Sequence, residues 1–95
     1  MSVVVMLTLK TQDDQYDALV AVMKEALPET AAYAGAELIR MAGDPQTKTL
    51  TLYEVWDKLE SQQAYMGWRT ETGFIDKIGP MLAAPPEVKP LDDLF

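Results

Sequence analysis

Residues 50–56 of the chain read Leu50-Thr51-Leu52-Tyr53-Glu54-Val55-Trp56, an alternation of two kinds of side chain. Successive side chains of an extended chain point to opposite sides, so the alternation predicts a β-strand, which we extend over 48–56. One side of this strand carries two leucines, a tryptophan and Glu54. Because its neighbours on that side are large and apolar, we expect the Glu54 carboxyl to point into the core.

Three further segments have strand patterns. Residues 3–10 alternate in the same way, and 36–41 are separated from the strand over 48–56 by Gly43-Asp44-Pro45, a turn signal that predicts a hairpin. The last apolar segment, around Val88 and Leu91, contains Pro90, which lacks an N–H. It can therefore form only an edge strand or an extended arm.

Two segments switch to the helical period. From Tyr16 to Leu27 the apolar residues recur every three or four positions, and we expect Pro28 to end this helix or to start a new turn. A second helix is predicted over 57–72, with Ala64, Tyr65 and Trp68 on its inner face. Gly73 ends it, and a shorter helical segment follows over 74–82.

The element order is strand, helix, strand, strand, helix, strand, which defines the α+β class. It predicts a ferredoxin-like split βαβ fold, with a four-stranded antiparallel sheet that carries its helices on one face. The 95 residues form a single domain, 1–95, with one modest core. Val4 and Met6 would lie on the bare face of the sheet, and we therefore expect a symmetric homodimer whose sheets pack face to face.

Composition excludes several classes of function. The chain has no Cys and no His, so it has no disulfide, no thiolate nucleophile, no imidazole base and no site built from His or Cys ligands. No Gly-rich phosphate loop is present either, and we expect no metal, haem or flavin cofactor. The net charge of −7 and the scattered cations exclude a nucleic-acid footprint.

The length of the apolar runs indicates whether the chain could span a membrane or carry a signal peptide. The longest, Val3 to Leu7, is too short to span a bilayer, and only Met1 and Ser2 precede it, without a basic segment. We therefore expect no membrane partner, no signal peptide and a soluble, cytoplasmic protein.

A strand that ends in Glu54-Val55-Trp56, followed by a helix with Ala64-Tyr65, resembles the antibiotic biosynthesis monooxygenase (ABM) domain family. Leu27-Pro28-Glu29-Thr30 leading to Gly35, and the segment 81–86, are also similar to that family, and the resemblance covers nearly the whole chain. It implies a dimeric α+β barrel. It also implies an oxygenase that oxidises anthrones or quinols with O₂ and needs neither metal nor flavin.

The chain departs from the family at several positions that bear on function, among them Ala31 and Ala36, where an Arg and a Cys are common. Many members carry a His near the middle of the second helix and another just after it, where this sequence has Trp68 and Gly73. Haem degradation through a His ligand and His-assisted oxygenation are therefore excluded.

Five residues are candidates for a site. Glu54 is the candidate base, because a buried carboxylate has a raised pKa, although an ion pair with Arg40 is the alternative. Trp56, Tyr65 and Trp68 would bind a flat aromatic substrate by stacking, or would simply fill the core. Arg69, if it turns inward, would stabilise a phenolate or enolate, and otherwise it is a solvated surface residue.

We therefore predict a cofactor-independent monooxygenase that acts on a small aromatic molecule. Two alternatives stay open because fold does not fix function. One is a non-catalytic dimer that binds a small molecule, and the other is an isomerase or cyclase on the same scaffold.

Overall fold

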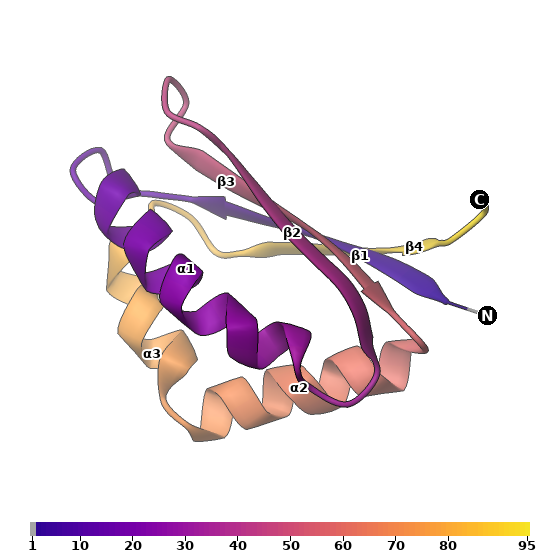
Figure 1. Ribbon diagram of the computed structural model, residues 1–95. Helices are drawn as coiled ribbons and strands as arrows, with labels where there is room; N and C mark the ends of the chain where they lie inside the picture. The colour runs from indigo at the N-terminus through magenta and orange to yellow at the C-terminus, as the bar shows by residue number, and fades with distance from the viewer. Residues whose placement is uncertain (1) are drawn as a thin grey trace.

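The elements follow one another in the predicted order in a computed structural model that describes residues 2–95 (Figure 1). The strands are β1 (Val3–Lys10), β2 (Ala36–Asp44), β3 (Thr49–Trp56) and β4 (Glu87–Asp92). The helices are α1 (Tyr16–Ala31), α2 (Leu59–Glu71) and α3 (Phe74–Ile78), and a short 3₁₀ turn, η1 (Gly79–Met81), follows α3.

All neighbouring strands of the sheet are antiparallel, in the order β2-β3-β1-β4. β1 pairs with β3 from Val3 opposite Trp56 to Lys10 opposite Thr49, and the strand with Pro90 is an edge strand as predicted. The helices gather on one side of the sheet (Figure 1). These features confirm the α+β, ferredoxin-like fold.

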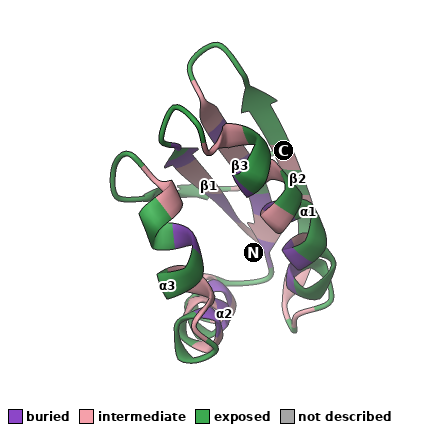
Figure 2. Cartoon of the chain, turned by 90° about the vertical axis from the view of Figure 1, so that its left-hand side faces the viewer, coloured by how far each residue is buried: buried purple, intermediate pink, exposed green. Residues whose placement is uncertain are grey.

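The core lies between the sheet and the helices, where Figure 2 shows the buried stretches of the strands and of the helix sides that face them. It consists of two clusters. The larger cluster joins β1 and β3 to α1 and α3 and contains Leu9, Leu19, Met23, Leu50, Leu52 and Ile78. The smaller cluster contains Val5, Trp56 and Tyr65 and joins the same strands to α2. Burial of each large apolar side chain contributes about 1.5–3 kcal/mol to the stability of the fold.

Of the two expectations for Pro28, that it ends the first helix is wrong, because α1 continues through it to Ala31. Pro28 has no N–H to donate, but its carbonyl still accepts a hydrogen bond from the Ala32 N–H at 3.1 Å, so the last turn forms. The buried residues Ala26 and Thr30, on either side of Pro28, keep this last part of the helix packed against the core.

The hairpin turn lies further along the chain than the sequence predicts. β2 includes Gly43 and Asp44, and the reversal occupies residues 45–48. Asp44 Oδ1 accepts hydrogen bonds from the backbone N–H groups of Gln46 and Thr47, at 3.0 and 3.4 Å. An aspartate that binds the backbone two residues ahead stabilises a turn after itself, which explains the shift.

No helix in the described part of the chain is long and apolar enough to cross a membrane.

Candidate functional site

Glu54 lies on the helix side of β3 and is only 3% exposed, as the strand pattern predicts. Trp56, two residues further along the same strand, donates a hydrogen bond from Nε1 to Glu54 Oε1 at 3.0 Å. The alternative ion pair with Arg40 does not form, because Arg40 is paired with Tyr53 and therefore lies on the opposite face of the sheet. Across the sheet, Glu54 is flanked by Val5 and Ile39.

Burial raises the pKa of the Glu54 carboxyl above its ordinary value of 4.5, and the hydrogen bond from Trp56 opposes part of this effect. The cause is desolvation, which disfavours the charged form of the carboxyl. A raised pKa makes the carboxylate a stronger proton acceptor. This is the direction that suits a general base working near neutral pH.

The raised pKa predicts a pH-dependent stability that Glu54→Gln removes. The folded protein binds the proton of Glu54 more tightly than the unfolded chain does, so this contribution is present in full below pH 4.5 and is lost as the pH rises through the raised pKa. Relative to the wild type, Glu54→Gln should therefore gain on the order of 1 kcal/mol between about pH 4 and about pH 8. Urea unfolding at both pH values measures this gain, with the exposed Glu60→Gln as control. A difference from wild type that is the same at both pH values would contradict the prediction.

An aromatic cluster, formed by Tyr33, Trp56, Tyr65 and Trp68, packs beside Glu54. Trp56 is fully buried and its ring centroid lies 5.3 Å from that of Tyr65. Tyr33 and Trp68 are stacked at 5.5 Å with an angle of 29° between their planes, and both are half-buried. Tyr33 was not predicted from the sequence, where its only signal is that it is the one aromatic residue between Leu27 and Gly35.

Arg69 is buried, but its guanidinium is directed to α1. Its Nε donates to Tyr65 Oη at 2.7 Å, and Nη2 donates to the Ala26 carbonyl at 2.8 Å and to Thr30 Oγ1 at 3.2 Å. The hydroxyls of Thr30 and Tyr65 are also hydrogen-bonded to each other. Because an arginine only donates, both hydroxyl oxygens act as its acceptors. Arg69 therefore fastens the end of α2 to the last turns of α1.

The structure brings the predicted site residues into one continuous layer. Glu54 contacts Trp56, the Trp56 ring packs on Tyr65, and Tyr65 accepts from Arg69. Trp68 lies at the edge of this layer, 6.0 Å from Tyr65 between ring centroids. Glu54 and Arg69 therefore lie at opposite ends of this layer, and the rings of Trp56 and Tyr65 lie between them.

The prediction that Ala64 shares the inner face of α2 with Tyr65 is wrong, because Ala64 is exposed. Of the two alternatives for the aromatic residues, core filling describes Trp56 and Tyr65, which are 0% and 6% exposed and occupy the space between α2 and the sheet. Trp68 is half-buried at the margin of this space, and the Tyr33 ring covers the Trp68 ring.

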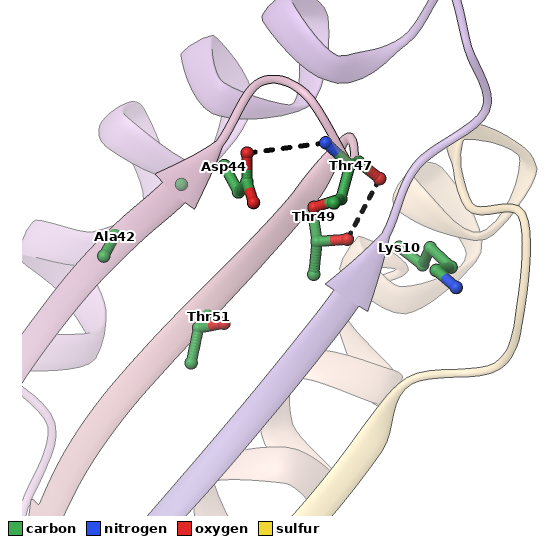
Figure 3. Close-up of a pocket in the computed structure, with 7 residues that line it drawn as sticks. Lys10, Ala42, Asp44, Thr47, Thr49 and Thr51 are labelled. Atoms are coloured by element: carbon green, nitrogen blue, oxygen red, sulfur yellow. Dashed lines mark hydrogen bonds between the residues drawn. The ribbon is translucent and has the colours of Figure 1, made fainter.

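A hollow of about 520 Å³ lies away from these residues, at the hairpin end of the sheet (Figure 3). Lys10, Ala42, Asp44, Thr47, Thr49 and Thr51 line it, together with Gly43. Asp44 is engaged by the turn, and Thr49 Oγ1 donates to the Thr47 carbonyl at 3.1 Å. Although this hollow is large, it holds no buried titratable group, so we place the candidate site at Glu54. Within residues 2–95, no three carboxylates gather closely enough to hold a metal ion.

No protein-family model matches the chain, and no curated protein matches it in sequence. Solved structures match it over nearly its whole length. Rv0793 from Mycobacterium tuberculosis is 20% identical with a TM-score of 0.86, and the match covers 100% of this chain and 97% of that one. A Nitrosomonas europaea protein named "Putative antibiotic biosynthesis monooxygenase" is 13% identical with a TM-score of 0.87, over 98% and 99% of the two chains. A Chloroflexus aurantiacus protein of the same name is 21% identical with a TM-score of 0.76, over 100% and 96%.

The fold is therefore the one found in structures named "putative antibiotic biosynthesis monooxygenase", as the resemblance in sequence predicts. At these identities the likeness defines the fold, and any activity must be argued from the residues of this chain.

Proposed function

We propose that the protein is a cofactor-independent monooxygenase that oxidises a small, electron-rich aromatic substrate of the quinol or anthrone type with O₂. The observation that carries the proposal is the buried Glu54 carboxyl, with its raised pKa, beside a cluster of aromatic rings. The names of the Nitrosomonas and Chloroflexus proteins support the same class of reaction.

The chemistry needs a base and a dry, aromatic environment. The Glu54 carboxylate takes a proton from the activated CH₂ of an anthrone-type substrate, and the resulting carbanion is electron-rich enough to reduce O₂ by one electron. The two radicals combine to a peroxide anion, which takes the proton back from Glu54. Loss of water from the hydroperoxide leaves a ketone, so CH₂ and O₂ become C=O and H₂O. The protein supplies proton transfer, orientation and exclusion of water.

Tyr33 and Trp68 are the proposed entrance. They are the half-buried members of the aromatic cluster, and they stack on each other above the buried Tyr65. A planar substrate that inserts between the Tyr33 and Trp68 rings would have an aromatic face on each of its two sides.

The role proposed for Arg69 changes with its contacts. Three of its five N–H donors are used by Tyr65, Ala26 and Thr30. The rings of Trp56 and Tyr65 lie between the guanidinium and Glu54, so Arg69 is too far away to stabilise a phenolate or enolate beside Glu54. We assign it as a positioning residue that holds the Tyr65 ring between Trp56 and Trp68.

The test is oxygen uptake by purified protein against a panel of anthrones and quinols, beside a no-protein control. The proposal requires protein-dependent consumption of one O₂ per substrate, with a ketone or quinone as product. Binding of the same compounds without uptake would favour a non-catalytic binding protein. Conversion without uptake would favour an isomerase or cyclase.

We also propose that the chain acts as a homodimer through the bare face of the sheet. Four rows of side chains cross this face, and the register gives them as Leu38–Val55–Val4–Leu91, Arg40–Tyr53–Met6–Lys89, Ala42–Thr51–Thr8–Glu87 and Asp44–Thr49–Lys10. The first row is entirely apolar, and Leu38 and Leu91 in it are 45% and 40% exposed. An apolar row of this kind on a sheet face is typical of an interface.

Charge favours a second copy as the partner of this face. The bare face carries three cations, Lys10, Arg40 and Lys89, against two carboxylates, Asp44 and Glu87. The whole chain has eight cations against fifteen carboxylates. The bare face therefore has a net charge of only +1, whereas the rest of the chain has five cations against thirteen carboxylates, so like-charge repulsion between two copies is weakest here.

Leu38→Glu should dissociate this dimer, because it places a carboxylate in the apolar row. Val88→Glu is the matched control, since Val88 is 48% exposed but pairs with Leu7 and so lies on the other side of the sheet. Sedimentation at micromolar concentration should show a dimer for the wild type and Val88→Glu and a monomer for Leu38→Glu. A wild-type chain that sediments as a monomer, with no loss of thermal stability on dilution, would contradict the proposal.

A further inference from the structure

A second hollow, of about 120 Å³, lies between α1 and α3, and the Arg69 guanidinium forms part of its wall. The other charged groups in its lining are Lys77 on α3 and Glu25 and Glu29 on α1. Phe74 and Val22 supply its apolar wall. None of Glu54, Trp56, Tyr65 and Trp68 lines it, and the one residue that it shares with the proposed oxygenase site is the positioning residue Arg69.

The Arg69 guanidinium is held by contacts on every side except the side that lines the hollow. Nε and Nη2 are hydrogen-bonded to side chains and backbone, and the guanidinium carbon lies 4.7 and 4.6 Å from the ring centroids of Trp68 and Phe74. The remaining nitrogen, Nη1, makes no hydrogen bond, and its contact is a 3.7 Å ion pair with Glu29 Oε1. Among residues 2–95 no side-chain nitrogen or oxygen is sealed from solvent without a partner, so Nη1 is open to the hollow.

Glu29 is a weak ion-pair partner for Arg69 Nη1. Its side chain is 63% exposed, and the ion-pair distance is longer than a hydrogen bond. Ion pairs of exposed side chains contribute little, since water and salt screen them. The buried guanidinium, in contrast, is already desolvated and oriented, so a carboxylate that enters the hollow meets a donor that needs no reorganisation.

We propose that this hollow binds a small aliphatic carboxylate. Its carboxylate group accepts hydrogen bonds from Arg69 Nη1, with Lys77 as the second cation, and its apolar body contacts Phe74 and Val22. The volume of the hollow, about 120 Å³, suits an acid with a short carbon chain. Glu29 competes with the ligand for Nη1, and Glu25 adds to the repulsion of an anion.

Isobutyrate and its neutral isostere isobutyramide are the probes, titrated into ¹⁵N-labelled wild-type protein at constant ionic strength. The amide tests the apolar contacts without the charge. Saturable shifts of the Arg69 Nε–H and of the Phe74 and Lys77 amides with isobutyrate alone are expected. No shift of these resonances, or equal shifts with both probes, would overturn the proposal.

Charge variants make the assignment specific to this hollow without altering the buried Arg69. Glu29→Gln should tighten isobutyrate binding about two- to fivefold, and Lys77→Gln should weaken it by a similar factor. Glu60→Gln changes the net charge by the same amount as Glu29→Gln but lies in the first turn of α2, far along the helix from Arg69. If Glu29→Gln and Glu60→Gln alter the affinity equally, the anion is bound by overall charge and the site does not exist.

Discussion

Replacing Gly35 by alanine should destabilise the fold by roughly 2–5 kcal/mol, because the added methyl group meets both a strained backbone and packed neighbours. Gly35 has a φ of +94°, in the region that side chains disfavour. A Cβ there would lie 2.6 Å from Ser61 Cβ and 2.7 Å from Asp57 Oδ1, closer than atoms can pack. The Gly35 carbonyl also accepts a hydrogen bond from the Asp57 N–H at 2.8 Å. This contact sets the start of α2 against the end of α1.

Gly67→Ala is the matched control. Gly67 lies inside α2, and nothing lies within 4 Å of the Cβ that alanine would add. Because glycine is a poor helix former, this change should stabilise the protein by up to about 1 kcal/mol. Urea unfolding of both variants measures the two free energies. A Gly35→Ala protein as stable as the wild type would show that the close packing of the α1–β2 connection against α2 is not present in solution.

The strands, their pairing and the inward direction of Glu54 could be predicted because a two-residue period leaves little freedom. Once Leu50, Leu52 and Trp56 share the buried side of β3, Glu54 must lie there too. The neighbouring strands follow from the same rule, since an antiparallel partner must present its own apolar side to the same helices. The order of the elements then selects the ferredoxin-like sheet.

The surroundings of the site could not be predicted in this way. Arg69 binds the Ala26 carbonyl, 43 residues away, and a long side chain with five N–H donors has no local pattern that reveals such a partner. Tyr33 lies in a short connection outside any helical or strand period, so its stacking on Trp68 was missed. Whether aromatic rings line a cavity or fill it depends on their packing in three dimensions, and here Trp56 and Tyr65 fill it.

The second large effect is expected from Glu54→Gln on turnover. Glutamine keeps the shape of the side chain and can still accept the hydrogen bond from Trp56 Nε1, but it cannot take a proton from a substrate. Loss of a general base lowers the rate by roughly 100- to 10,000-fold. Binding should change little, since the stacking surface of the aromatic cluster is untouched. Trp68→Ala should do the reverse and weaken binding, because it removes stacking area at the entrance.

The most direct measurement is the initial rate of oxygen uptake by wild type and Glu54→Gln at saturating substrate, across pH, with tryptophan fluorescence reporting binding in the same samples. We expect the wild-type rate to rise with pH through the raised pKa of Glu54, as the carboxylate form becomes populated. The variant should bind the substrate normally and lose both the rate and its pH dependence. A Glu54→Gln protein that binds the substrate and turns it over at the wild-type rate would contradict the assignment of Glu54 as the base.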